Sequence, residues 1–236
     1  MSTNFKTLTA ISALLALTAC GGSDGNSVTE NLENSFDAAY EFYDNNVNED
    51  GDGNHIYVDP SDIQKTSASY SGYMTIQTVN DEFTETPQGN ENYDEGVHLE
   101  YAIGTTKLDA TFENGSANIE GSADNFEYIM VEHITTRDSN GEEISSMTIE
   151  ENLASLDGSV DVDGAISGTD GSLINVAGSL SGVVDGQTFE ASASDTITAN
   201  FIEDNDGNEM FYANGTLEIS GFQDIDDNTT IFAVAD

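Results

Sequence analysis

The sequence predicts an all-β protein, an antiparallel up-and-down β-barrel of about eight strands. From residue 67 onward, apolar and polar residues alternate, as they do in strands that bury one face. Dipeptides suited to tight hairpin turns recur so closely that no helix fits between them. A two-layer sandwich would also accommodate such strands. Closing the sheet into a barrel would in addition remove its exposed edges.

One helix is predicted before the barrel. Ser27 and Glu30 have the spacing of a capping box, and apolar residues then recur at helical intervals. This stripe consists of Val28, Leu32, Phe36, Ala39, Tyr40 and Tyr43. We expect an amphipathic helix over residues 28–43 that covers the neighbouring core. It should end before residues 44–53, which are rich in Asn, Asp and Gly.

Within the predicted barrel, alternation is clearest in residues 97–112. Val97, Leu99, Tyr101 and Ile103 share one face, which is typical of a half-buried strand, and Leu108, Ala110 and Phe112 repeat the pattern. Hairpin turns are predicted at Asn114-Gly115, Ser139-Asn140-Gly141, Asp163-Gly164, Asp170-Gly171, Asp185-Gly186, Asp206-Gly207 and Asn214-Gly215. The last strand is predicted over residues 229–234.

The strand faces opposite the predicted core are polar. Asp109, Glu113, Asn118 and Glu120 lie on them, whereas a barrel that spans a membrane needs an apolar band facing lipid. We therefore expect the outside of this barrel to face water.

The first twenty residues have the pattern of a bacterial export signal. Lys6 precedes a short apolar run over residues 8–17, which is about half the length that a spanning helix needs. Leu17-Thr18-Ala19-Cys20 resembles the lipobox of bacterial lipoproteins. The resemblance implies diacylglycerol transfer to the Cys20 sulfur, cleavage before Cys20 and acylation of its new amino group, for example by palmitate. The alternative is an ordinary secretory leader with an incidental cysteine, although no second cysteine exists to pair with Cys20.

These patterns divide the chain into four parts. We expect a lipoprotein signal peptide at 1–19, a flexible tether at 20–26, the helix and an acidic loop at 27–66, and the barrel domain at 67–236. Two or more acyl chains would hold the protein firmly in a membrane. Gly21 follows the cysteine where aspartate would resemble an inner-membrane retention signal, so an outer-membrane location is favoured.

The chain is strongly acidic, with a formal net charge of −41. Cleavage would remove Lys6 and no acidic residue, leaving 3 basic and 45 acidic side chains. Such a surface excludes nucleic acid as a partner, because phosphate binding needs clustered Lys and Arg. The acidity could serve to capture a cation or a basic protein, or it could simply maintain solubility in salt.

One loop has the pattern of a calcium site. Asn48, Asp50, Asp52 and Asp59 occupy positions 1, 3, 5 and 12 of a calcium-binding loop, and Gly53 occupies position 6. Asn at position 1 and Asp at position 12 depart from the usual ligands, and clustered Asp and Asn also form ordinary solvated loops. Residues 204–209 form a second acidic turn with the same two interpretations.

Nothing in the sequence indicates catalysis. The three histidines, His55, His98 and His133, have no spacing that would place two on one metal ion, so haem or zinc ligation by them is not predicted. The chain has no Gly-x-Ser-x-Gly elbow and no glycine-rich phosphate loop before a helix. We therefore expect a protein that is not an enzyme.

Short glycine-rich motifs carry a family resemblance. Ser69-Tyr70-Ser71-Gly72-Tyr73, the stretch from Asn114-Gly115-Ser116 through Gly121 to Asn125-Phe126, and Thr230-Ile231-Phe232-Ala233 resemble the β-barrel domain of transferrin-binding-protein-like surface lipoproteins over residues 67–235. The resemblance implies an eight-stranded barrel, a lipid anchor and surface display for capturing a host protein, haem or another solute. Large receptors of that family carry two lobes, whereas this chain has one barrel, and no transferrin-binding loop is identifiable.

The sequence therefore predicts a monomeric, lipid-anchored, surface-exposed binding module whose loops meet an unknown protein or small-molecule ligand. The alternative is a structural or adhesion lipoprotein of the cell envelope, stiffened by calcium if the loop at 48–59 binds it. Tyr73, Tyr101 and Tyr128 grouped in the barrel interior or in a loop cleft would favour small-ligand binding. A packed interior together with a featureless rim would favour the structural alternative, in which the barrel is a spacer in the cell envelope.

Overall fold

The structure is a computed structural model of the 236-residue chain. It describes residues 36, 41–43, 45–48, 54–85, 94–137, 143–184, 187–217, 219–220 and 228–235. Within these ranges, only the backbone is described for 78–85, 94–98, 132–137, 143–153, 187, 219–220 and 228. The predicted signal peptide and tether, including Cys20, lie outside the described residues.

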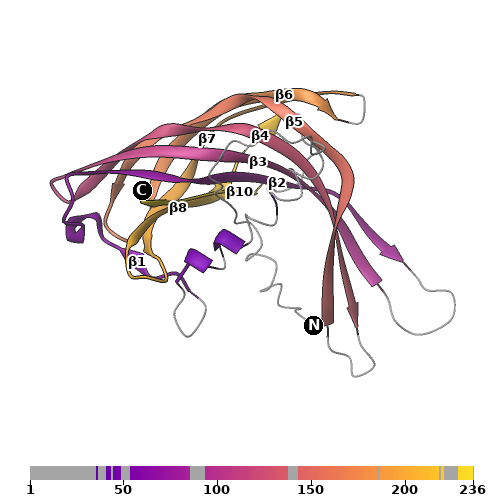
Figure 1. Ribbon diagram of the computed structural model, residues 1–236, viewed down its shortest axis with the longest axis horizontal. Helices are drawn as coiled ribbons and strands as arrows, with labels where there is room; N and C mark the ends of the chain where they lie inside the picture. The colour runs from indigo at the N-terminus through magenta and orange to yellow at the C-terminus, as the bar shows by residue number, and fades with distance from the viewer. Residues whose placement is uncertain are drawn as a thin grey trace, which may run out of the picture.

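Long antiparallel strands make up most of the described chain (Figure 1). The elements are β1 (Tyr57–Val58), η1 (Pro60–Asp62), β2 (Ser67–Glu85), β3 (Asp94–Glu113), β4 (Ser116–Arg137), β5 (Glu143–Ser167), β6 (Ser172–Val184), β7 (Gln187–Glu203), β8 (Glu209–Thr216), β9 (Ile219–Ser220) and β10 (Asn228–Ala235). Each strand from β2 to β8 pairs with the next along the chain. The short strands β1 and β9 both pair with β7.

The C-terminal strand β10 closes the sheet. It pairs with β8 on one side and with β2 on the other, so the eight strands β2 to β8 and β10 form a closed antiparallel barrel. The fold predicted from the sequence is confirmed, and the last strand falls where it was predicted. At the closing seam Gly72 lies opposite Ala233. A Cβ atom on Gly72 would lie 1.8 Å from the carbonyl oxygen of Phe232, so the two strands meet this closely only because residue 72 has no side chain.

Tight turns connect the strands at one end of the barrel. Asn114 and Gly115 have positive φ angles of 55° and 79° and join β3 to β4, as their sequence predicts. The predicted turns at Asp170-Gly171 and Asp206-Gly207 also lie between strands. At the opposite end the connections are 86–93, 138–142, 185–186 and 217–227, the last of which contains β9. The turns predicted at Ser139-Asn140-Gly141 and Asp185-Gly186 fall on residues outside the described ones.

Two turn predictions are wrong. Asp163-Gly164 lies inside β5, and Asn214-Gly215 lies inside β8. These glycines make room for large neighbours instead of reversing the chain. A Cβ atom on Gly164 would lie 2.7 Å from Ile174, and one on Gly215 would lie 2.9 Å from Ile197.

Along β3, even-numbered residues face the barrel interior throughout the described side chains. Ala102, Leu108 and Ala110 all belong to the main core. The predicted apolar face at Leu99, Tyr101 and Ile103 therefore points outward, yet these side chains are at most 3% exposed. The prediction of a half-buried strand is wrong here, because the outside of the wall is covered as well.

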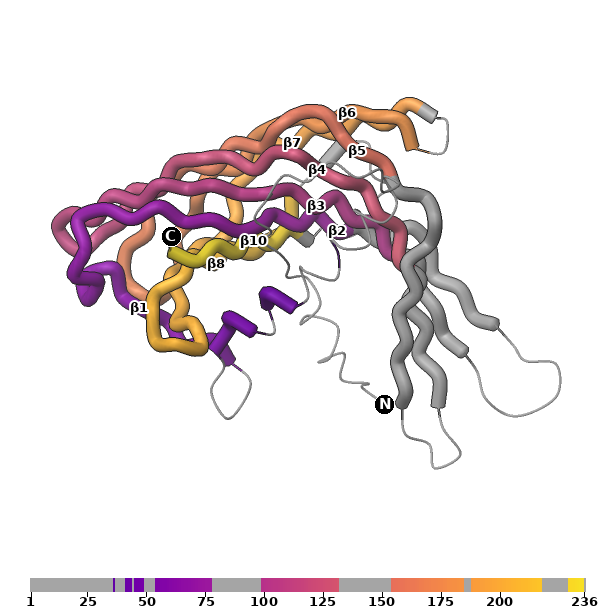
Figure 2. Tube along the Cα trace, in the orientation of Figure 1, coloured from indigo at the N-terminus to yellow at the C-terminus, as the bar shows by residue number. Residues whose placement is uncertain are grey.

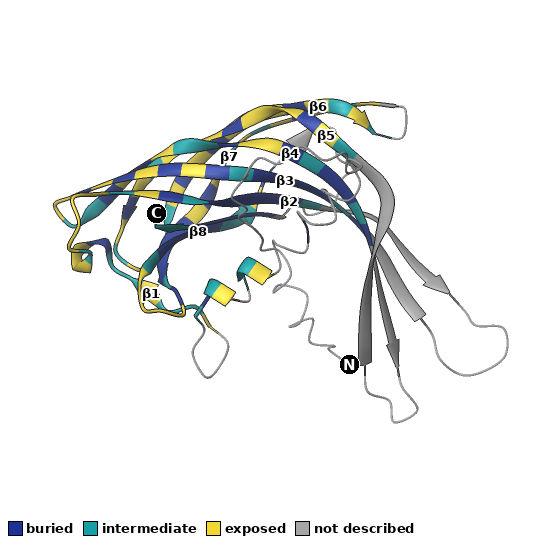
Figure 3. Ribbon diagram, in the orientation of Figure 1, coloured by how far each residue is buried: buried dark blue, intermediate teal, exposed yellow. Residues whose placement is uncertain are grey.

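The outer wall is covered in one sector and exposed in another. Along β5 and β6 outward residues are exposed and alternate with buried ones, as the two-residue period requires (Figure 3). Asp109, Glu113, Asn118 and Glu120 are exposed as predicted. Along β10 every residue from Thr229 to Ala233 is buried, so this strand has neighbours on both faces.

The part of the chain before β1 that the structure describes, Phe36, 41–43 and 45–48, is called the N-terminal segment here. It lies against the outside of β8 and β10 (Figure 2). Phe36, 41–43 and 45–46 are helical; the rest of the predicted helix 28–43 lies outside the described residues. The helical residues continue beyond position 44, where the helix was predicted to end. Asn46 explains the difference, since its Nδ2 donates to the Phe42 carbonyl at 2.8 Å and stabilises the last turn. In the described part of the chain, no helix is long and apolar enough to cross a membrane.

Replacing Gly72 with Ala tests the closing seam. The added Cβ atom would force β2 away from β10, so we expect the free energy of unfolding to fall by about 3 kcal/mol or more. Gly168→Ala is the matched control, because Gly168 has φ 67° and no atom within 4 Å of the added carbon. We expect it to cost only about 1 kcal/mol. Urea denaturation followed by circular dichroism measures both, and equal losses would contradict the close approach at the seam.

Candidate functional site

Side chains fill the barrel interior. Near η1 the rings of Tyr70, Phe112 and Phe211 pack around Phe201, with centroid distances of 5.8, 5.6 and 6.3 Å. Between β5, β6 and β7 a cavity of about 10 Å³ remains, which is room for about one water molecule. Where its side chains are described, the interior is packed, and this cavity is far too small for haem or a similar solute.

The three tyrosines considered as a ligand group lie apart. Tyr128 faces inward and packs against Phe189, with ring centroids 5.7 Å apart. Tyr73 and Tyr101 face outward, on the covered side of the wall. The structure does not bring these rings together, so they do not line a common cavity.

An aromatic cluster attaches the N-terminal segment to the outer wall. His55 lies between Tyr212 and Tyr43, with centroid distances of 4.6 and 6.4 Å. Tyr43 in turn contacts Phe232 of β10 at 5.4 Å. His55, one of the three imidazoles noted in the sequence, is thus part of a packed cluster.

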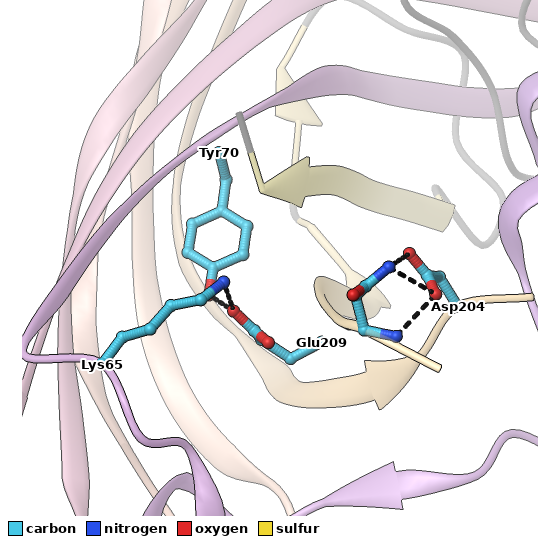
Figure 4. Close-up of polar contacts among 5 residues, drawn as sticks. Lys65, Tyr70, Asp204 and Glu209 are labelled. Carbon is cyan, nitrogen blue, oxygen red and sulfur yellow. Dashed lines mark hydrogen bonds and ion pairs between the residues drawn. The ribbon is translucent and has the colours of Figure 1, made fainter. Parts of the chain in front are cut away.

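A polar clasp lies at the end of the barrel that η1 covers (Figure 4). The Nζ of Lys65 donates to Oε1 of Glu209 at 2.5 Å, and the Tyr70 hydroxyl approaches the same oxygen at 3.5 Å. Burial, and then the charge of Glu209 and the hydrogen bond to it, raise the pKa of Tyr70 far above its ordinary value. Tyr70 therefore remains a hydrogen-bond donor at neutral pH, and the clasp joins the segment before β2 to β8.

Asp204 organises the turn between β7 and β8 (Figure 4). Its Oδ1 accepts hydrogen bonds from the backbone amides of Asp206 and Asn208 at 2.9 and 2.7 Å, and its Oδ2 accepts from Nδ2 of Asn208 at 3.1 Å. The same turn holds the N-terminal segment, because the backbone amide of Asn205 donates to the Asn46 carbonyl at 3.0 Å. This acidic turn, one of the two considered for calcium, is built on hydrogen bonds to its own backbone.

The predicted calcium loop is only partly described. Asn48 donates through Nδ2 to Oε1 of Glu203 at 3.1 Å. Asp59 accepts from the backbone amide of Ser61 at 2.8 Å and caps η1, which lowers the pKa of its carboxyl group. Asp50 and Asp52 lie outside the described residues. Within the described ranges, no three His, Cys, Asp or Glu residues come together to hold a metal ion, and calcium binding stays a prediction.

The strand register places the other two histidines on neighbouring strands. His98 of β3 pairs with Glu132 of β4, and His133 of β4 pairs with Val97, the residue before His98. Only the backbone is described at both positions, so the absence of a shared metal site stays a prediction from the sequence.

The exposed wall carries aligned carboxylates. Asp109 of β3, Glu120 of β4 and Asp163 of β5 lie directly opposite one another across the three strands. Asn175 of β6 donates to Asp163 at 3.0 Å, and Ser69 of β2 donates to Asp109 at 2.6 Å. Facing like charges weaken a sheet and repel anions. This wall suits water, salt or a cationic partner.

No family model matches this sequence, and no curated protein or solved structure matches it either. The resemblance to transferrin-binding-protein-like lipoproteins therefore stays a prediction. Function has to be inferred from the barrel, its two ends and its walls.

Buried tyrosines predict alkaline unfolding. Burial raises the pKa of Tyr70, Tyr73 and Tyr101 above the ordinary value of 10.0, and it raises the pKa of Tyr212 to about 12. In the unfolded chain these groups lose protons above about pH 10, whereas in the folded protein they stay protonated. Each should therefore lower the free energy of unfolding by up to about 1.4 kcal/mol per pH unit above pH 10.

Tyr101→Phe isolates one of these groups. The Tyr101 hydroxyl is buried and has no hydrogen-bond partner among the described residues, so its removal should not destabilise the protein at pH 7. Urea titrations between pH 9 and pH 11 should show a shallower loss of stability in the variant. An unchanged slope would contradict the burial of this hydroxyl.

Proposed function

We propose that this protein is a lipid-anchored lipoprotein of the outer membrane, displayed at the cell surface, whose barrel is a rigid platform for equilibrium capture of a protein or small solute. The closed barrel with long connections at one end carries the proposal. A filled eight-stranded barrel provides no binding cavity in its lumen but holds its connections in fixed positions. Loops on such a scaffold are where binding residues are usually found.

The two ends of the barrel differ, and the difference favours one of them for binding. At one end the connections are tight, and Val58, Pro60 and Ile63 are packed beneath the strands. The opposite end has the long connections 86–93 and 217–227 as well as the shorter ones at 138–142 and 185–186. We infer that a ligand is met at this second end, because longer connections can present more side chains than a two-residue turn.

Charge limits the class of ligand. The wall carries the opposed carboxylates of β3 to β5, and the sequence has 45 acidic residues against four basic ones. An anionic ligand would be repelled over much of this surface, whereas a cationic or neutral one would not. A basic protein segment or an uncharged solute is therefore the favoured partner.

The rival function is a structural or adhesion lipoprotein. A packed interior is equally suited to a spacer, which needs rigidity and no ligand. Selective binding that survives high salt would distinguish capture from this alternative.

Cys20→Ser tests the anchor. Without the sulfur no diacylglycerol can be attached, so the variant should lose palmitate labelling and appear in the soluble fraction, because acyl chains supply the membrane affinity. Ser23→Ala, within the predicted tether, is the control and should stay labelled and membrane-bound. Continued labelling of the Cys20→Ser variant would refute the lipoprotein assignment.

Binding is tested with residues 27–236 as a soluble bait in extracts of the organism's natural surroundings. A shaped site should retain its ligand in about 1 M salt, where screening confines electrostatic attraction to roughly 3 Å. A bait carrying Asp109→Asn and Glu120→Gln is the control, and it should capture the same ligand because the wall is not the proposed site. Loss of all binding in high salt would favour the spacer.

A further inference from the structure

The covered sector of the outer wall spans several neighbouring strands. Its outward side chains include Met210 of β8, Phe232 of β10, Tyr73 of β2, Tyr101 of β3 and Ile129 of β4, and each is at most 4% exposed. We call these five residues the apolar wall. Elsewhere on the barrel, as along β5 and β6, outward positions are exposed. Part of the chain must therefore lie over the apolar wall.

Two described contacts show how the cover begins. At β10 the Tyr43 ring lies 5.4 Å from Phe232, and at β3 the Phe36 ring lies 5.5 Å from Tyr101 in an edge-to-face arrangement with 70° between the planes. A single phenyl ring is too small to bury the outward residues of β4 as well. Ile129 and Val131 are nevertheless both 0% exposed.

The spacing of these contacts matches a helix that crosses the strands. An α-helix rises 1.5 Å per residue, so residues 36 and 43 are about 10.5 Å apart along its axis. From β10 through β2 to β3 is two strand spacings, or about 9.6 Å. Phe36 and 41–43 are helical, in agreement with this path.

We propose that residues 28–40 complete an amphipathic helix that docks on the apolar wall and crosses β2 and β3 to reach β4. One further helical turn before Phe36 advances by about 6 Å, slightly more than one strand spacing, and places Leu32 over Ile129 and Val131. Val28, Leu32, Phe36, Ala39 and Tyr43 form the docked stripe. The acidic residues Glu30, Glu33, Asp37 and Glu41 face away, and Glu41 is exposed in the structure.

This docking also sets where the lipid tether leaves the barrel, a consequence that rests on the proposed lipid anchor. With Leu32 over β4, the helix start at Val28 lies about one strand further, at β5. The tether at 20–26 would start there, and seven extended residues reach at most about 25 Å. The apolar wall would then lie on the membrane side of the molecule, and the exposed wall of β6 and β7 would lie beyond the start of the tether.

The test uses the full chain with Cys20→Ser, so that the outcome does not depend on lipidation. Leu32→Cys is combined with Ile129→Cys or, as a control, with Ser179→Cys on the exposed side of β6. Mild oxidation should join the first pair within one chain and leave the control pair unjoined. Equal joining of both pairs, or joining of residue 32 to 179 alone, would overturn the proposal.

A second measurement covers the case in which neither pair is joined. The single variant Ile129→Cys should react slowly with a maleimide, and adding Leu32→Asp should speed the reaction about tenfold by undocking the helix. The control, Glu41→Asp on the exposed side of the helix, should leave the rate unchanged. Neither substitution should change the maleimide rate of a protein whose cysteine is at position 179 instead of 129. If Leu32→Asp leaves the maleimide rate at residue 129 unchanged, the docking proposal is wrong. If the wild-type protein is not labelled with palmitate, only the proposed lipid anchor is wrong.

Discussion

Closure of the sheet between β2 and β10 is the constraint on which the rest of the structure depends. Once the last strand pairs on both sides, the barrel has no unpaired edge between its eight strands, and its lumen must be filled or hydrated. Here it is filled. The aromatic rings around Phe201 occupy one end, and Gly164 and Gly215 leave room where Ile174 and Ile197 need it. In the part of the barrel whose side chains the structure describes, the lumen is packed, so a binding function is better carried by the outer surface or the connections.

The strand pattern and the turn at Asn114 and Gly115 could be predicted because both depend on local properties. Alternation of apolar and polar residues predicts which residues share a face of a strand. An Asn-Gly dipeptide predicts a hairpin turn, because both residues tolerate positive φ angles. The location of the core along β3 could not be predicted in this way. Its apolar residues change from odd positions at Leu99 and Tyr101 to even positions at Leu108 and Ala110, while the strand itself does not change face. That change of parity is the signal that a second layer covers the outside, and it is visible in the sequence.

Other features could not be predicted because they join residues that are far apart in the chain. The clasp links Lys65 to Glu209, which are 144 positions apart. The turn at Asp204 holds Asn46, and no local pattern identifies that partner. The wrong turn prediction at Asp163 and Gly164 has a related cause. An Asp-Gly dipeptide can form a hairpin turn, but it can also lie inside a strand where the glycine leaves room for a bulky residue opposite, and only the distant partner strand decides between the two. Such contacts follow from closure, which brings the two ends of the sheet together.

The surfaces of the barrel can now be assigned by elimination. The described part of the lumen is packed, one end is covered by η1 and the clasp, and one sector of the outer wall is covered by the N-terminal segment. What remains is the end with the longer connections and the exposed wall, which runs from the half of β3 and β4 near Asn114 round to β7. On that wall the aligned carboxylates of Asp109, Glu120 and Asp163 oppose the approach of anything anionic.

β6, by contrast, has no charged residue between Ser172 and Val184 and exposes Leu173 and Val183. A partner that approaches from the side would therefore meet the uncharged strand with less electrostatic cost than its acidic neighbours, whereas a partner at the open end would meet connections held in place by the closed sheet.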